Sequence, residues 1–150
     1  MALRLEDVLE MWKNDSEIDE LKLDESSRDS ARLHAKYLEM LSVTRLQLKR
    51  KEAEFRTLLK DKWLWYNGKM SKDEIDARGW DYDPLGGLKV LKGDMDYFYD
   101  SDEDIQTAKM KIDYLKEIVA TLEEIINNIR FRPNNIKNMI EWRKFTSGIY

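Results

Sequence analysis

Four cations between positions 45 and 60 are spaced to form one face of a helix. On a wheel of about 100° per residue they fall within about 60° of one another, in a stripe about 22 Å long. Such a row neutralises the phosphates of a nucleic acid and releases its counterions. The alternative is an ordinary solvated helix surface. The stripe consists of Arg45, Lys49, Arg56 and Lys60.

Aromatic rings follow this stripe in the segment LLKDKWLWYNGK, residues 58–69. Lys62 falls about 260° from Arg45, on the apolar side of the same wheel, and Lys69 follows the expected helix end. Single-stranded nucleic acid uses both kinds of group, because cations hold phosphates and bases stack on rings. No base-reading motif is present, so we expect binding that is independent of base sequence and weakened by salt. The rings are Trp63, Trp65 and Tyr66, and core packing is their alternative role.

Other chemistry has little support in the sequence. There is no cysteine and one histidine, His34, which excludes thiol nucleophiles, disulfides and multi-histidine metal sites. Glycine motifs that cradle phosphates are absent. The acidic residues 94–104 lack the spacing of a calcium loop, because the twelfth position from Asp94 is Ile105 and not glutamate. We expect no catalytic residues, no metal site and no cofactor.

Charge is distributed in blocks that the net charge of -4 hides. The blocks carry -6 over residues 1–30, +7 over 31–72, -8 over 73–104 and +3 over 105–150. Local basic density decides counterion release, so the acidic total does not exclude nucleic-acid binding. No apolar run approaches the length of a membrane span, and the start MALRLEDVLEMW lacks signal-peptide features. We therefore expect an intracellular protein without membrane contact.

Hydrophobic periodicity predicts a mainly α fold in one helical domain, residues 1–150. A short helix ends near 14–16, and a second of about 40 residues begins within 24–27 and stops at Asn67-Gly68. A third helix, with Ser101 as its N-cap, carries an unbroken heptad seam. The seam consists of Ile105, Ala108, Ile112, Leu115, Val119, Leu122, Ile126 and Ile129.

A weaker seam runs along the second helix from Tyr37 to Trp65, so the two long helices are predicted to fold back as an antiparallel hairpin. Residues 68–101 join them as an irregular, acidic insert rich in glycine and aromatic residues, with at most a small β-hairpin.

The segment 131–134 is predicted to break the seam, and residues 132–150 to form a short oligomerisation helix. Its apolar surface exceeds what one short helix buries on a monomer of 18.0 kDa, so a homo-oligomer is favoured. The candidate interface residues are Ile136, Met139, Ile140, Trp142 and Phe145.

Three places in the chain resemble the UvsY recombination-mediator proteins of large tailed phages. The start MALRLEDVLEMW is similar to the family's opening RLEDL helix, and LLKDKWLWYNG is similar to its LKARLDYYSG segment. A lysine and an arginine two residues apart in that segment contribute to single-strand binding, and the matching positions are Lys60 and Lys62, with Asp61 between them. The C-terminal residues resemble the family's self-assembly region at Phe131, Ile136, Lys137, Met139, Phe145 and Gly148.

The resemblance implies a protein that is not an enzyme and that forms a ring of six or seven copies. It implies binding to single-stranded DNA, a weakened grip of the single-strand-binding protein, and loading of a RecA-like recombinase in the cytoplasm of the infected host cell. The strand-binding residues are then Lys60, Lys62, Arg56, Lys49, Arg45 and Lys69. A second hypothesis is a non-enzymatic coiled-coil oligomeric adaptor whose basic face binds an acidic protein.

Overall fold

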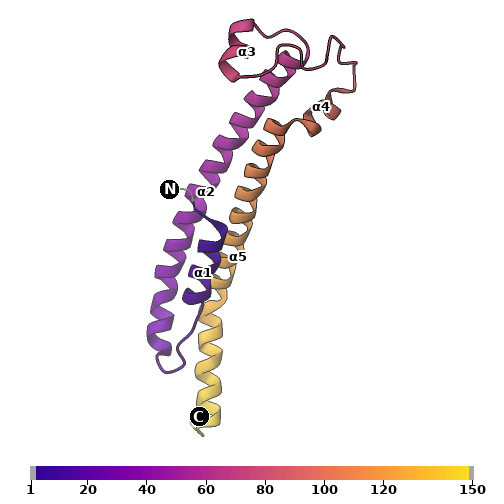
Figure 1. Ribbon diagram of the computed structural model, residues 1–150. Coiled ribbons are helices and arrows are strands. Elements are labelled where there is room, and N and C mark those ends of the chain that lie inside the picture. The colour runs from indigo at the N-terminus through magenta and orange to yellow at the C-terminus, as the bar shows by residue number, and fades with distance from the viewer. Residues whose placement is uncertain (1–2, 149–150) are drawn as a thin grey trace. The chain divides into compact units, whose positions relative to one another are not determined.

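Figure 1 shows the computed structural model, which describes residues 3–148. The predicted mainly helical fold is confirmed, and residues 3–148 contain no strand, so the small β-hairpin is absent from this range. No helix within this range is long and apolar enough to cross a membrane. The helices are α1 (Leu5–Asp15), α2 (Leu23–Tyr66), α3 (Lys72–Arg78), α4 (Met95–Ser101) and α5 (Glu103–Thr146).

The chain groups into two compact units, each with a segment of α2 and a segment of α5. Unit 1 contains the described residues of 1–47 and 115–150, and unit 2 contains residues 48–114. In unit 1, α1 packs beside the α2 and α5 segments and closes an apolar core (Figure 1). Val8 of α1, Tyr37 of α2 and Leu122 of α5 are fully buried in this core.

The core of unit 1 is wider than the predicted seam. Ile118, Ile125 and Arg132 lie seven residues apart on α5 and are all buried, although none of them belongs to the seam. A helix that packs against two neighbours must bury a broader face than one in a two-helix pair, and here α1 is the second neighbour. The short first helix therefore sets how much of α5 is covered.

The predicted helix break at 131–134 is wrong, because α5 continues to Thr146 with Pro133 inside it. A proline in a helix removes one hydrogen bond and crowds the preceding turn, at a cost of about 3 kcal/mol. Burial on both sides offsets that cost, since Ile129 and Ile136 are each 2% exposed. Residues 132–146 are thus the end of α5 and not a separate helix.

Two short helices lie within the predicted irregular insert, and the rest of residues 68–101 is irregular as predicted. α3 is capped at its start by Ser71, whose hydroxyl accepts the N–H of Glu74 at 3.3 Å, and at its end by Gly79, with a φ of 69°. The Ser-x-x-Glu spacing is a capping-box signal that predicts this start. α5 is capped by Asp102 and not by the predicted Ser101, because Asp102 Oδ1 accepts the N–H of Ile105 at 3.0 Å.

Candidate nucleic-acid interface

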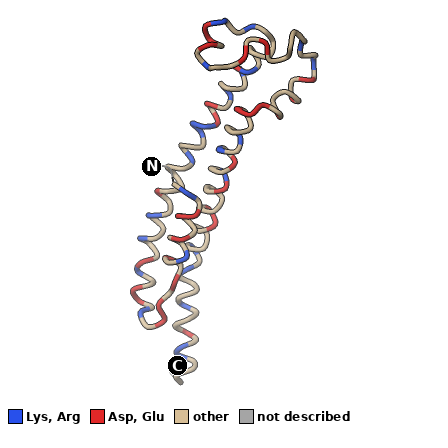
Figure 2. Tube along the Cα trace, viewed as in Figure 1, with Lys and Arg blue, Asp and Glu red and all other residues tan. Residues whose placement is uncertain are grey.

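Three of the predicted strand-binding cations lie exposed on the α2 segment of unit 2. Lys49, Arg56 and Lys60 each point to solvent, and none has an ion pair within the described residues. Figure 2 shows how cations recur along this part of α2. Their charge is therefore not cancelled within the unit and is available to an anionic ligand.

Arg45, the first cation of the stripe, lies in unit 1 and has a partner there. Its Nη2 donates to Oε1 of Glu123 on α5 at 2.8 Å. Both side chains are about half exposed, so solvent screens the pair and it adds little to stability. The carboxylate nevertheless neutralises Arg45, so its charge is less available to an anionic ligand than that of the other three cations.

Lys62 is buried and does not lie on the exposed stripe. Its residue is 2% exposed, and Nζ lies 3.0 Å from Oδ2 of Asp102 and 2.8 Å from Oδ2 of Asp104. The ammonium also lies over two rings, 4.4 Å from the centroid of Trp65 and 4.0 Å from that of Trp80. The position of Lys62 on the apolar side of the helical wheel of α2 is consistent with this burial.

The partner Asp102 is held by several donors at once. Its Oδ2 accepts a hydrogen bond from Tyr66 Oη at 2.6 Å in addition to the ion pair with Lys62. Burial would raise the pKa of Asp102, but the bonds from Tyr66 and Ile105 and the Lys62 ammonium outweigh it and hold that pKa below the ordinary value of 3.8. Burial and the bond to Asp102 raise the pKa of Tyr66 in turn. The cluster therefore keeps the carboxylate of Asp102 charged inside unit 2.

Two lysines at the surface of unit 2 lie over exposed rings. Nζ of the predicted Lys69 is 4.7 Å from the ring centroid of Trp63, which is 39% exposed. Nζ of Lys72 is 5.6 Å from the ring of Tyr82, which is 58% exposed. Lys72 and Tyr82 were not predicted as site residues, because they are ten positions apart in the chain and come together only through the fold of α3 and the segment after it. A ring beside a cation is the pair that stacks a base and holds its phosphate.

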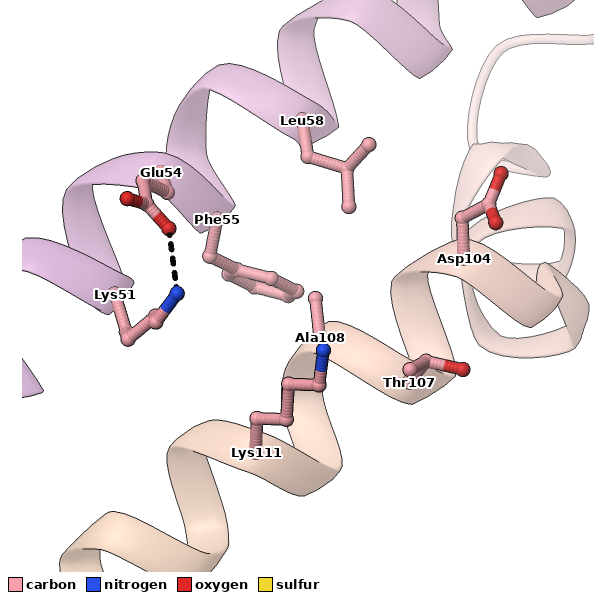
Figure 3. Close-up of a pocket in the computed structure, with 8 residues that line it drawn as sticks. All are labelled: Lys51, Glu54, Phe55, Leu58, Asp104, Thr107, Ala108 and Lys111. Atoms are coloured by element: carbon pink, nitrogen blue, oxygen red, sulfur yellow. Dashed lines mark hydrogen bonds and ion pairs between the residues drawn. The ribbon is translucent and has the colours of Figure 1, made fainter. Parts of the chain in front are cut away.

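A shallow pocket of about 270 Å³ lies between α2 and α5 within unit 2 (Figure 3). Phe55 points toward Ala108 at its floor, and two lysines and two carboxylates surround it. Lys51 is already paired with Glu54 at 3.1 Å. The balanced charge favours no ionic ligand here. Within residues 3–148 no group of three or more metal-binding side chains is present either.

The predicted oligomerisation residues divide into buried and exposed members. Ile136 is 2% exposed and packs within its own chain, so it is removed from that candidate surface. Met139 and Ile140 are half-buried. Trp142 and Phe145 are 66% and 60% exposed, with stacked rings whose centroids are 5.6 Å apart. Of this predicted set, only Trp142 and Phe145 in the last turns of α5 therefore present a large apolar surface.

Together, the fold and this site define a mainly helical protein with a surface of exposed cations and rings. Residues 11–149 match the family described as "Recombination, repair and ssDNA binding protein UvsY". The match covers most of the chain, and the protein belongs to the UvsY family.

A relative and several crystal structures support this assignment. The chain is 25% identical to the recombination protein uvsY of Enterobacteria phage T4 over 146 residues, which covers 97% of this chain and 99% of that protein. The bacteriophage T4 recombination mediator protein UvsY in lattice type II matches with a TM-score of 0.83 at 23% identity, over 97% of this chain and 99% of that one. The structure of the same protein in lattice type I matches with a TM-score of 0.80 at 22% identity, over 93% of this chain and 98% of that one. These structures share the fold of this protein.

Proposed function

We propose that this protein is a recombination mediator that binds single-stranded DNA through unit 2. The observation that carries the proposal is the pairing of exposed lysines with exposed rings, Lys69 with Trp63 and Lys72 with Tyr82. The cations Lys49, Arg56 and Lys60 lie on the same unit, without ion pairs in the described range. Membership of the UvsY family supports the mediator role.

Phosphates are bound by the α2 cations and bases stack on the two rings, so affinity depends little on base sequence. The protein is not an enzyme. Bound along a strand in the cytoplasm of the infected host cell, it weakens the grip of the single-strand-binding protein and helps a RecA-like recombinase load. Two of the six predicted cations, Arg45 and Lys62, are not part of this proposed interface, because their charges are already paired within the protein.

Assembly into a ring of six or seven copies is the second part of the proposal. A weak strand-binding surface repeated around a ring binds one strand with higher avidity than any single copy. The exposed rings of Trp142 and Phe145 are the proposed subunit contact. Replacing both by glutamate yields smaller species in sedimentation velocity and weaker DNA binding. An unchanged assembly moves the contact to another surface.

Fluorescence anisotropy with an oligo(dT) strand at several salt concentrations tests the DNA proposal. Lys60→Met makes the slope of log K against log[salt] shallower by about 0.7 for each subunit that engages the strand, the value for one phosphate contact on a single strand. Lys116→Met, an exposed cation on α5 of unit 1, is the matched control and leaves the slope unchanged. If polyglutamate competes as well as oligo(dT), the basic face binds an acidic protein and the adaptor hypothesis replaces this one.

A further inference from the structure

We infer that Lys62 is a positioning residue: its buried ammonium ties the segment after α3 and the start of α5 to the end of α2, and it makes no contact with DNA. The effect of Lys62 on DNA binding rests on the proposed function. Its effect on the packing of unit 2 concerns the free protein and is tested without DNA.

One nitrogen atom joins three parts of unit 2. Asp102 and Asp104 come from the start of α5, Trp65 comes from α2, and Trp80 follows α3. The Trp65 and Trp80 rings are tilted with centroids 5.0 Å apart, and both lie within reach of the ammonium. A cation held between rings and carboxylates away from water gains from each of them. Loss of the Lys62 ammonium therefore weakens the packing of α2 against both the segment after α3 and the start of α5.

Two further contacts connect the cluster with the proposed strand-binding surface. Trp65 Nε1 donates to the carbonyl of Asp81 at 2.7 Å, which places the neighbouring residue Tyr82. Arg78 at the end of α3 pairs with Asp61 of α2 at 3.0 Å and also lies 5.4 Å from the Trp80 ring. The exposed ring of Tyr82 and its lysine thus stand on a segment that the Lys62 cluster anchors.

Asp102 explains why an apolar residue cannot simply replace Lys62. Its side chain is 4% exposed, so without the ammonium a buried carboxylate loses its counter-charge. The same carboxylate caps α5 and accepts the Tyr66 hydroxyl. Asparagine at position 102 removes the charge, its Oδ1 still accepts the N–H of Ile105, and its Nδ2 replaces the second oxygen as a donor to the Tyr66 hydroxyl, so it is the natural compensating change.

Lys62 has no free ammonium to offer a phosphate. Its side chain is 3% exposed, and two carboxylates take its donors. Lys60, two residues earlier on the same helix, is exposed and has no ion pair in the described residues. The two lysines are therefore a matched pair, in which one is expected to contact DNA and the other to hold the structure.

The test compares three variants of the full chain: Lys62→Met, Lys60→Met, and Lys62→Met combined with Asp102→Asn. Hydrogen exchange of the free protein, read by mass spectrometry, reports on residues 72–82 and 99–105. Lys62→Met speeds exchange in both segments by about a hundredfold or more, the scale of a buried ion pair that loses one partner. Lys60→Met leaves the exchange rates of both segments unchanged. Lys62→Met combined with Asp102→Asn restores a large part of the protection against exchange.

Salt-dependent anisotropy separates positioning from contact. Lys62→Met weakens oligo(dT) binding but keeps the wild-type salt slope, whereas Lys60→Met makes the slope shallower by about 0.7 for each engaged subunit. A Lys62→Met protein with native exchange and a shallower slope overturns the inference, because Lys62 then contacts a phosphate. If Lys62→Met does not fold, the slope of the double variant distinguishes contact from positioning in the same way. If Lys60→Met leaves the slope unchanged, the proposed DNA site fails, while the exchange result still decides the role of Lys62.

Discussion

Unit 1 and unit 2 use the same two long helices but are closed by different chemistry. The apolar cluster of Leu33, Tyr37, Ile118 and Leu122 lies entirely in unit 1. Where the α2 seam reaches unit 2 it carries lysine at 51 and 62 and aromatic residues at 55 and 65. An apolar seam stabilises by removing area from water, and charged seam positions cannot do this. Unit 2 buries fewer apolar side chains, among them Ile75, Ile105 and Ile112, and adds ion pairs and rings, which leaves cations and aromatic groups near its surface.

Among the residues that the structure describes, each unit buries one cation, Arg132 in unit 1 and Lys62 in unit 2, and the two are held differently. In unit 1, Nη1 of Arg132 donates to the carbonyls of Asp15 and Ser16 at 3.2 and 3.3 Å, and Nη2 to that of Glu17 at 3.1 Å. A planar guanidinium suits these acceptors at the end of α1, where helix carbonyls lack partners. In unit 2 the compact ammonium of Lys62 takes two carboxylates. Each cation holds a connecting segment against a long helix: Arg132 holds the residues at the end of α1 against α5, and Lys62 holds residues 80 and 102–104 against α2.

The largest expected difference between the units is in the cost of an apolar deletion. Leu122→Ala removes a fully buried side chain from unit 1 and lowers the free energy of unfolding by about 4 kcal/mol. Leu58→Ala in unit 2 removes a half-buried one and costs about 1 kcal/mol. Urea denaturation followed by circular dichroism measures both. Equal costs would mean that unit 2 has an apolar core as strong as that of unit 1.

Removing the buried cation of unit 1 is expected to cost slightly less. Arg132→Met leaves three carbonyls without their charged donor and lowers the free energy of unfolding by about 3 kcal/mol. It also speeds amide exchange over residues 15–22. Arg130→Met changes an exposed cation two residues earlier on the same helix and stays within about 0.5 kcal/mol of wild type. Native exchange in Arg132→Met would show that α1 is held by its apolar face alone.

Acid is expected to loosen unit 2 through Asp102. Because the folded pKa of Asp102 lies below 3.8, its contribution to stability is fully present above that ordinary value and is lost as the pH falls through the folded pKa. Exchange protection at residues 103–106 should decline with acid in that range. Asp102→Asn makes the decline shallower. A decline of the same steepness in that variant would assign the acid sensitivity to another carboxylate.

The smallest expected effect compares two cations on α2. Lys49→Ala makes the salt slope of oligo(dT) binding shallower by about 0.7 for each engaged subunit, because this lysine has no ion pair in the described residues. Arg45→Ala changes it less, since Glu123 already neutralises Arg45. Anisotropy titrations over a series of salt concentrations resolve the difference. A larger change for Arg45 would extend the interface into unit 1.

The long helices could be predicted from the sequence because their signals are local and repeated. The heptad positions from Ile105 to Ile129 and the stop at Asn67-Gly68 agree with the observed α5 and α2. Pro133 could not be placed in the same way. A proline predicts a break from its own chemistry, whereas the burial of Ile129 and Ile136 that outweighs it depends on the packed structure.

The candidate site was predictable in its composition and less so in its geometry. Residue types and spacing predicted a surface of cations and rings. They did not predict which lysine is exposed, because Asp102 and Trp80 lie far from Lys62 in sequence. The position of Lys62 on the apolar side of the wheel was the one signal of its burial. The pairing of Lys72 with Tyr82 depends on α3, whose signal was the Ser71–Glu74 capping box.

Ultraviolet crosslinking of the wild-type protein to oligo(dT) tests strand binding by unit 2 most directly, because thymine crosslinks to aromatic rings that stack on it. Tandem mass spectrometry then locates the modified residues. We expect crosslinks at Trp63 and Tyr82, the exposed rings that lie beside Lys69 and Lys72 in unit 2. Crosslinks confined to aromatic residues of unit 1, such as Trp12 or Trp142, would contradict the proposed interface.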